Sequence, residues 1–213
     1  MNNLAEKLAS YKVIPVVAIE RVEDVVPLGK ALSENGLDII EITFRTTAAT
    51  DAIALLRKEL PEMYIGAGTV LDEEQVKQAC EAGASFIVAP GFNPHTLQAC
   101  RKYNIPFIPG VCTPSELEHA RHQGIRLMKF FPAEAAGGVA MLKALSGPYK
   151  DVRFMPTGGV NEGNISQYLA LPNTVACGGT WMVPQPLIEA RNWQEIGRLT
   201  KKAVSVIIES GDK

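Results

Sequence analysis

Short apolar segments rich in β-branched residues recur along this chain, and amphipathic segments separate most of them. The apolar segments are Val13–Ile19, Leu37–Thr43, Met63–Gly68, Ser85–Pro90, Pro106–Gly110, Ile125–Phe130, Val152–Thr157 and Thr174–Gly178. The amphipathic segments are Val22–Asn35, Ala48–Leu60, Asp72–Ala82, Pro94–Tyr103 and Pro114–Gln123. Apolar strands that alternate with helices are typical of βαβ units around a parallel sheet buried on both faces.

The number and spacing of these units favour a closed barrel over an open sheet. The strand candidates follow one another at intervals of roughly 20–25 residues, which fits eight β/α units with short connections. Asn35-Gly36, Ala82-Gly83 and Gln123-Gly124 each end a helical segment with a residue that tolerates positive φ. Thr113-Pro114-Ser115-Glu116 opens a helix with a cap, a proline and an acid. We predict one α/β domain, residues 1–213, folded as a (β/α)8 TIM barrel.

Two more helices are predicted at the ends of the chain. Leu4–Ser10 reads as a short N-terminal helix that covers the barrel floor, and Asn192–Ser210 reads as a final helix against the outer wall. No linker, low-complexity segment or second domain interrupts the pattern.

Composition narrows the expected partners and location. The chain has 213 residues, of which 46% are hydrophobic and 21% charged, with a net charge of -2 and no basic block. Neither nucleic acid nor an anionic membrane is therefore expected as a partner. Apolar runs such as Val13–Ile19 are too short to span a bilayer, and the first seven residues lack the apolar core of a signal peptide. We expect a cytoplasmic protein.

Neither cysteine nor histidine forms a metal or disulfide pattern. The four cysteines are scattered, with no CxxC pair, at Cys80, Cys100, Cys112 and Cys177. In a cytosolic chain such cysteines are expected to be free thiols. His119 and His122 could share a helix face, but no convincing third ligand completes a metal site, so we expect solvated histidines.

One lysine lies inside an apolar strand candidate. Lys129 stands in Arg126-Leu127-Met128-Lys129-Phe130-Phe131-Pro132. Burial removes water from an amine and favours its neutral, nucleophilic form. In a barrel strand, Lys129 is thus a candidate for Schiff-base formation with a carbonyl substrate. The alternative is a structural lysine in an ion pair with Glu41.

The second strand candidate carries polar residues on one side. Glu41, Thr43 and Arg45 share that side if the extended geometry persists, with Ile40, Ile42 and Phe44 facing the helix layer. Active sites of such barrels lie at the carboxyl ends of the strands. A buried carboxylate and a buried guanidinium must pair or bind a ligand. A ligand site and a structural Glu41–Arg45 pair both stay open.

Small residues end the next three strand candidates, in Gly66-Ala67-Gly68-Thr69, Ala89-Pro90-Gly91 and Pro109-Gly110. Such residues either leave space for a ligand or allow tight turns, and we favour tight turns.

Strands seven and eight end in Thr157-Gly158-Gly159 and Gly178-Gly179-Thr180. Paired glycines expose backbone N–H groups where barrels often bind phosphate, so we predict a phosphate site there.

These strand ends resemble a known family. Glu41–Thr46, Gly66–Val70, Lys129–Glu134 and Pro156–Val160 match, in order and spacing, the motifs of 2-keto-3-deoxy-6-phosphogluconate (KDPG) aldolases. Many of these enzymes also cleave 4-hydroxy-2-oxoglutarate (KHG), and the resemblance runs over nearly the whole chain. It implies a class I aldolase of carbohydrate metabolism, in the Entner–Doudoroff pathway, that needs no metal and no cofactor and is usually a homotrimer.

By position, the resemblance also implies roles for single residues. Lys129 is the Schiff-base lysine and Glu41 the general acid/base. Around the pyruvate portion, the implied contacts are Arg45 and Thr69 on the carboxylate and Pro90 and Phe131 on the pocket wall. The implied phosphate ligands are Thr157, Gly158, Gly159, Gly178, Gly179 and Thr180. The family often has Ser where this chain has Thr180, which keeps the hydroxyl but adds a stiff β-branched methyl.

Three other functions stay open on the sequence. A sugar-phosphate isomerase or epimerase would use Glu41 for proton transfer and Lys129 as an electrostatic clamp, with no covalent intermediate. An aldolase could prefer the galactonate epimer or an unphosphorylated keto acid. A non-catalytic barrel that binds a phosphorylated metabolite would use Lys129 and Glu41 only to neutralise each other.

Overall fold

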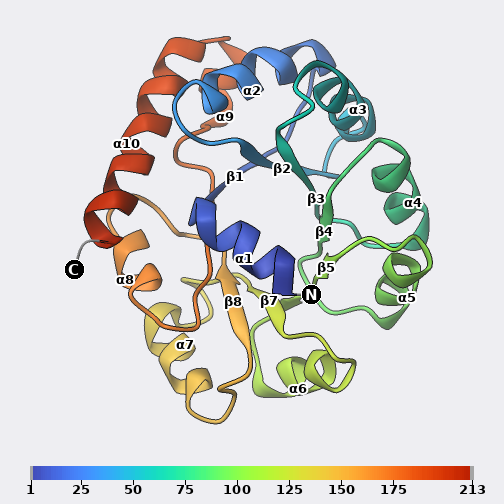
Figure 1. Ribbon diagram of the computed structural model, residues 1–213, viewed down its shortest axis with the longest axis vertical. Helices are drawn as coiled ribbons and strands as arrows, with labels where there is room; N and C mark the ends of the chain where they lie inside the picture. Colours follow the sequence, from blue (N-terminus) through green and yellow to red (C-terminus); the bar gives the residue numbers. More distant parts are fainter. Residues whose placement is uncertain (1, 212–213) are drawn as a thin grey trace.

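The computed structural model describes residues 2–211, in which parallel strands pair side by side inside a ring of helices (Figure 1). The strands are β1 (Val13–Val17), β2 (Ile39–Thr43), β3 (Tyr64–Gly68), β4 (Phe86–Val88), β5 (Phe107–Ile108), β6 (Gly110–Val111), β7 (Leu127–Phe130), β8 (Arg153–Pro156) and β9 (Cys177–Gly179). They pair in the orders β5-β4-β3-β2-β1-β9 and β6-β7-β8.

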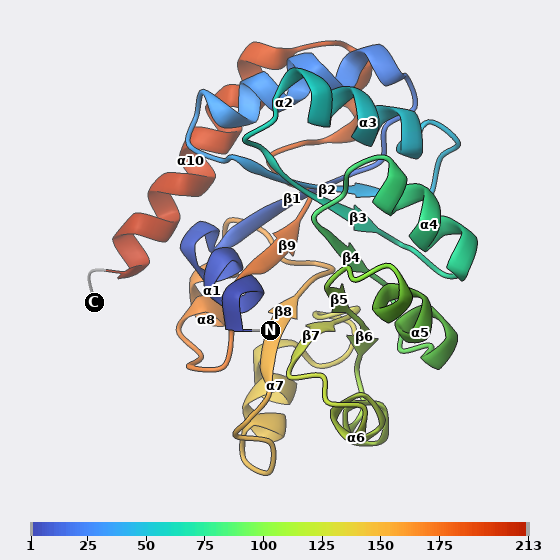
Figure 2. The ribbon, with the colours of Figure 1, turned by 45° about the vertical axis from the view of Figure 1, so that its right-hand side comes forward.

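Two connections close these strands into a barrel. β5 and β6 flank Pro109 and are two parts of one barrel strand; Pro109 has no N–H, but its carbonyl accepts from Lys129 N–H at 2.8 Å. The parallel bridges Phe154–Thr174 and Thr157–Gly178 join β8 to the β9 segment. The sheet thus closes with eight strand positions, and Figure 2 shows its curvature. The predicted (β/α)8 barrel is confirmed.

Helices surround this barrel, and the helices predicted from the sequence are present. The helices are α1 (Asn2–Tyr11), the 3-10 helix η1 (Val22–Asp24), α2 (Val25–Ser33), α3 (Ala49–Glu59), α4 (Glu73–Glu81), α5 (Pro94–Lys102), α6 (Pro114–His122), α7 (Gly138–Ser146), α8 (Ile165–Leu169), α9 (Gln185–Glu189) and α10 (Trp193–Gly211). The sequence pattern did not identify α7, α8 and α9. Within the described residues, no helix is long and apolar enough for a membrane span.

The helix ends follow the predicted local chemistry. Thr113 and Glu116 form a full capping box, in which the Thr113 hydroxyl accepts from Glu116 N–H and the Glu116 carboxylate accepts from Thr113 N–H at 2.9 Å. Gly36, Gly83 and Gly124 have φ values of 94°, 92° and 84°. A side chain at these positions would be strained, which explains glycine after three of the helices.

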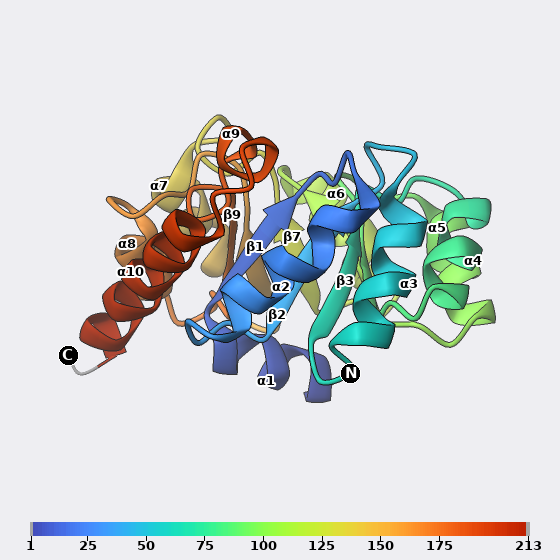
Figure 3. The same cartoon turned by 90° about the horizontal axis from the view of Figure 1, so that it is seen from above.

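The floor of the barrel is closed by α1. Leu8 is fully buried, and it belongs to an inner apolar cluster with Ile14, Phe86 and Met155 from three strands. Figure 3 shows α1 below the strands, at the end opposite to the strand carboxyl ends. The predicted floor helix is therefore confirmed, and any site at the carboxyl ends opens on the other side of the molecule.

Three of the small residues at strand ends serve packing rather than turns, so the turn prediction is wrong for them. Gly66 and Gly68 lie inside β3, and Gly110 lies in β6. A Cβ at Gly66 would overlap the ring of Phe86, and one at Gly110 would overlap the Pro90 carbonyl. These glycines are needed because neighbouring strands bring bulky groups to their Cα atoms.

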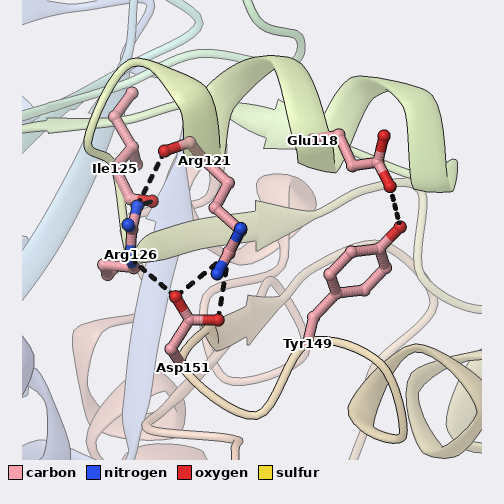
Figure 4. A network of polar contacts seen from close by, with 6 residues as sticks. All are labelled: Glu118, Arg121, Ile125, Arg126, Tyr149 and Asp151. Atoms are coloured by element: carbon pink, nitrogen blue, oxygen red, sulfur yellow. Dashed lines mark hydrogen bonds and ion pairs between the residues drawn. The ribbon is translucent and has the colours of Figure 1, made fainter.

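A charged network ties the lower end of α6 to the start of β8 (Figure 4). Asp151 accepts from Arg121 Nε at 3.0 Å and forms an ion pair with Arg126 Nε at 2.9 Å. The hydrogen bond from Arg121 lowers the pKa of the Asp151 carboxyl below its usual range. The network lies at the amino ends of β7 and β8, opposite to the strand carboxyl ends where the predicted site residues lie, and we assign it to stability.

The cysteines and histidines behave as expected from the sequence. All four cysteines are free thiols, and burial raises the pKa of Cys100 to about 12. His119 and His122 lie exposed on α6. Residues 2–211 contain no group of three or more His, Cys, Asp or Glu side chains suited to a metal ion.

We predict that Gly66→Ala lowers the free energy of unfolding by about 1–3 kcal/mol, because the added methyl group would overlap the buried Phe86 ring. Gly91→Ala is the matched control, since no atom lies within 4 Å of its added Cβ and neither glycine has positive φ. Urea denaturation of both variants measures the difference. Equal stability of the two variants would contradict the packing argument.

We predict that Asp151→Asn destabilises the protein at neutral pH and that the deficit shrinks in acid. The folded-state pKa of Asp151 is lowered, so its stabilising contribution is present above the unfolded value of about 3.9 and is lost as the pH falls through the folded-state pKa. Unfolding measured from pH 7 to pH 3 tests this. Glu62→Gln, in an exposed loop, is the control; a pH-independent deficit for Asp151→Asn would refute the linkage.

Candidate active site

A buried ion pair spans the interior of the barrel near its upper end. Lys129 on β7 lies with its Nζ 3.3 Å from Oε1 of Glu41 on β2. Lys129 is 5% exposed and Glu41 is fully buried. The structure therefore contains the Lys129–Glu41 pair that the sequence left open, and the alternative Glu41–Arg45 pair is wrong.

Strand alternation and one glycine explain how Glu41 reaches this position. Ile40 and Ile42 pack in the outer apolar cluster, which turns Glu41 inward, as the period of two predicts. Gly68, on neighbouring β3, gives Glu41 its space, because a Cβ at Gly68 would overlap the carboxylate. The glycines of β3 thus leave room for a functional side chain.

Glu41 retains one carboxylate oxygen without a partner. Its Oε2 is buried and accepts no hydrogen bond from residues 2–211. Leaving a buried polar atom unsatisfied typically costs about 1–3 kcal/mol, and more when it is charged. Lys129 Nζ also lies 5.1 Å from the centre of the Phe131 ring, which bounds the pocket on that side. An unpaired oxygen beside a buried amine is suited to exchange protons with a ligand.

Arg45 follows Glu41 at the carboxyl end of β2, but it does not continue the extended geometry that the sequence prediction assumed. β2 ends at Thr43, and Arg45 is exposed in the following turn. Its Nε donates to Thr43 Oγ1 at 3.2 Å, and Thr43 Oγ1 in turn donates to the Val17 carbonyl at 2.9 Å. No carboxylate of the described chain forms an ion pair with Arg45. The guanidinium is therefore held near the barrel mouth and is free to bind an anion.

Thr69 and Pro90 follow β3 and β4 at the same end. Thr69 has φ of 56°, an uncommon value for a β-branched residue. Such strain persists only where the surrounding structure enforces it, and it is frequent at ligand sites. Pro90 is half-buried, and its carbonyl closely approaches Gly110. Both residues thus lie at the carboxyl ends of their strands, and their predicted contacts with substrate stay predictions.

The two glycine pairs lie side by side, as predicted. The bridge between Thr157 and Gly178 brings the two segments together, and Gly178 leaves room for the Thr157 hydroxyl. Gly158 and Gly159 have φ of 99° and 78°. The bridge directs the Gly158 N–H toward the Gly178 carbonyl, whereas the Gly159 N–H donates to no group within the described part of the chain; the Gly158 carbonyl accepts from Glu134 N–H. A loop in this conformation with a free N–H group is suited to bind an anion.

Gly179 and Thr180 complete the second glycine segment. Gly179 packs against the ring of Trp181, which would overlap any Cβ there. Thr180, by contrast, is exposed, and an exposed position has room for the methyl group that threonine adds to serine.

Two residues of this region had no assigned role in the sequence. Glu134 follows the lysine strand, and its carboxylate accepts a hydrogen bond from the Tyr168 hydroxyl on α8. Glu134 ends the Lys129–Glu134 motif, so the sequence could have drawn attention to it. Tyr168 lies in a helix that the sequence pattern did not identify, and nothing in the sequence near it indicated a role. Glu134 lies directly beside Gly159.

A (β/α)8 barrel with a buried lysine–carboxylate pair and an anion-binding loop at the same end has the fold and site of a lysine-dependent aldolase. Comparison with known proteins identifies the family. Residues 4–199 match the aldolase family described as KDPG and KHG aldolase. The chain is 50% identical over 204 residues to 2-dehydro-3-deoxy-phosphogluconate aldolase of Haemophilus influenzae, which covers 96% of each chain.

Solved structures give the same assignment. The KDPG aldolase of Legionella pneumophila, with pyruvate captured at low pH as a covalent carbinolamine intermediate, has a TM-score of 0.90 and 43% identity over 93% of this chain and 97% of that chain. The 2-keto-3-deoxy-6-phosphogluconate aldolase of Zymomonas mobilis ZM4 with 3-phosphoglycerate has a TM-score of 0.86 and 35% identity over 93% and 94%. This chain belongs to the KDPG and KHG aldolase family.

The buried pair yields a stability prediction. Lys129→Met should lower the free energy of unfolding by about 3 kcal/mol, because it leaves Glu41 buried without its only charged partner among the described residues. Lys129→Met combined with Glu41→Leu should recover most of that loss, since no buried charge then remains. Chemical denaturation of the three proteins measures this; equal stability of wild type and Lys129→Met would contradict it.

Proposed function

We infer that this protein is a class I aldolase that cleaves KDPG to pyruvate and D-glyceraldehyde 3-phosphate, and KHG to pyruvate and glyoxylate. The observation that supports this most strongly is the buried Lys129–Glu41 pair with one carboxylate oxygen free. Family membership supports the same reaction. A non-catalytic role for the pair would leave the unpaired carboxylate oxygen of Glu41 without a purpose.

The first steps form an imine on Lys129. Glu41 lies close enough to take a proton from the Lys129 ammonium, which leaves a neutral amine. The amine attacks the C2 ketone of the substrate, and loss of water, with the proton returned by Glu41, gives a protonated imine and restores the Glu41 carboxylate. Arg45 and Thr69 hold the substrate carboxylate, for which the planar guanidinium supplies two parallel donors. Pro90 and Phe131 bound the pocket around the three-carbon end.

The next steps break the C3–C4 bond. Glu41, through a water molecule, removes the proton from the C4 hydroxyl, and the electrons of the C3–C4 bond move into the imine. The aldehyde leaves, and an enamine of pyruvate stays bound to Lys129. A proton returned to C3 and attack of water on the imine release pyruvate and restore the amine.

The phosphate of the larger substrate is held at the other end of the pocket. We assign this to the loop of Gly158 and Gly159, the adjacent segment Gly178–Thr180 and the Thr157 hydroxyl. The free N–H group of Gly159 and the side-by-side placement of the two segments support this assignment. KHG has no phosphate and would leave this end empty.

We also propose that residues 1–213 act as one catalytic domain, of which residues 1 and 212–213 lie outside the described part. We further propose that the enzyme is a homotrimer and that it is cytoplasmic. The family resemblance supports the trimer, and the free cysteines fit a reducing compartment. Sedimentation equilibrium tests the trimer; a monomeric mass at micromolar concentration would refute it.

The proposed covalent step is tested by trapping. Incubation with pyruvate and borohydride should add one reduced pyruvate to the protein, on Lys129, as located by peptide mass spectrometry. Lys129→Met should show no adduct and no cleavage of either substrate, with circular dichroism as the control for folding. An isomerase or a binding protein would give no adduct, so its absence in the wild type would overturn the proposal.

The proposed proton carrier is tested separately. Glu41→Gln should still form the adduct but lower kcat for both substrates by roughly 100-fold or more, because general acid/base catalysis contributes on that order. Steady-state kinetics and the trapping yield are measured on the same preparation. Unchanged turnover would exclude Glu41 from proton transfer.

A further inference from the structure

The turn after β7 is hydrogen-bonded to the anion-binding loop. The N–H groups of Ala133 and Glu134 donate to the carbonyls of Thr157 and Gly158 at 2.8 and 3.0 Å. These bonds fix the carbonyl side of the loop. The bridge between Thr157 and Gly178 directs the Gly158 N–H toward the Gly178 carbonyl, whereas the Gly159 N–H has no acceptor within residues 2–211 and is left for a ligand.

The Glu134 side chain lies directly against this loop. A Cβ added at Gly159 would stand 2.6 Å from Glu134 Cγ, so glycine is needed there for the contact. Tyr168, fully buried, donates its hydroxyl to Glu134 Oε1. Gly138 leaves the space for this pair, since a Cβ there would lie 3.1 Å from Glu134 Oε1 and 3.2 Å from the Tyr168 hydroxyl.

The Glu134 carboxylate lies beside the proposed phosphate site, and its negative charge would disfavour phosphate binding. Two negative charges repel, and a carboxylate is itself a good acceptor for free backbone N–H groups. Glu134 makes no ion pair with any described residue, so no cation offsets its charge. The Tyr168 hydroxyl is the donor that the structure places on this carboxylate. Burial, and then the bond to Glu134, raises the pKa of Tyr168, which keeps the hydroxyl protonated as a donor.

We propose that Tyr168 and Glu134 are positioning residues for the phosphate group of the substrate. Tyr168 holds the Glu134 carboxylate beside Gly159, where it supports the loop and cannot occupy the Gly159 N–H group. Without the hydroxyl, the carboxylate is free to turn toward this group and compete with phosphate. This inference rests on the proposed function and adds the means by which the phosphate site is kept open.

The first test is Tyr168→Phe, which removes one hydroxyl and keeps the ring. KM for KDPG should rise roughly threefold to tenfold, as expected for one lost hydrogen bond, while KM for the unphosphorylated KHG stays unchanged. Tyr149→Phe is the matched control, because Tyr149 also donates to a glutamate, Glu118, at 2.8 Å, but on the exposed surface (Figure 4). An equal rise of KM for both substrates would overturn the proposal.

A second variant separates charge from packing. Tyr168→Phe combined with Glu134→Gln removes the free negative charge and should return KM for KDPG to within about twofold of wild type. A merely structural role of the hydroxyl predicts no such rescue. Failure of the double variant to recover would therefore overturn the competition between Glu134 and phosphate.

Phosphate binding gives a readout that does not depend on cleavage. Calorimetric titration of inorganic phosphate into wild type, Tyr168→Phe and the double variant should show weaker binding in the single variant and recovery in the double variant. Borohydride trapping of pyruvate should be the same in all three. Loss of trapping in the wild type would contradict the proposed function, whereas equal phosphate affinities with normal trapping would contradict this inference alone.

Discussion

The ion pair between Lys129 and Glu41 is the interaction on which the upper end of the barrel depends. Removing two charges from water costs several kcal/mol per ion, and their attraction offsets this only with good geometry. The barrel provides that geometry from β2 and β7, which are not neighbours in the sheet. The glycine at 68 leaves the room, and one carboxylate oxygen stays unpaired. The pair is therefore better explained by chemistry than by stability.

The same strand that carries the lysine also organises the distant end of the pocket. β7 ends at Phe130, and four residues later Glu134 lies against the loop of Gly158 and Gly159. The turn after β7 donates hydrogen bonds to the carbonyls of Thr157 and Gly158, and the Gly159 N–H has no acceptor among the described residues. One continuous segment thus connects the buried lysine to the loop that we propose as the phosphate site. Under this proposal, a change in either part would misplace the other.

Much of this architecture could be predicted from local sequence, because it follows from local physics. The inward direction of Glu41 follows from strand alternation, and the start of α6 follows from the chemistry of Thr113 and Glu116. The remainder depends on contacts between distant segments. Gly66 reads as a turn residue until pairing brings Phe86 against it. Arg45 leaves the strand plane because β2 ends at Thr43, and Tyr168 meets Glu134 across 34 residues.

In the proposed reaction Lys129 and Glu41 act together, the imine on Lys129 as the electron acceptor and Glu41 as the proton carrier. The most direct measurement is the exchange of the methyl protons of pyruvate with deuterium, followed by proton NMR in D2O without any aldehyde. It tests both roles at once, because exchange requires an imine and then an enamine. The wild type should exchange these protons, Glu41→Gln should do so far more slowly, and Lys129→Met should not exceed the rate without enzyme. Exchange by Lys129→Met at the wild-type rate, or none by the wild type, would contradict the account.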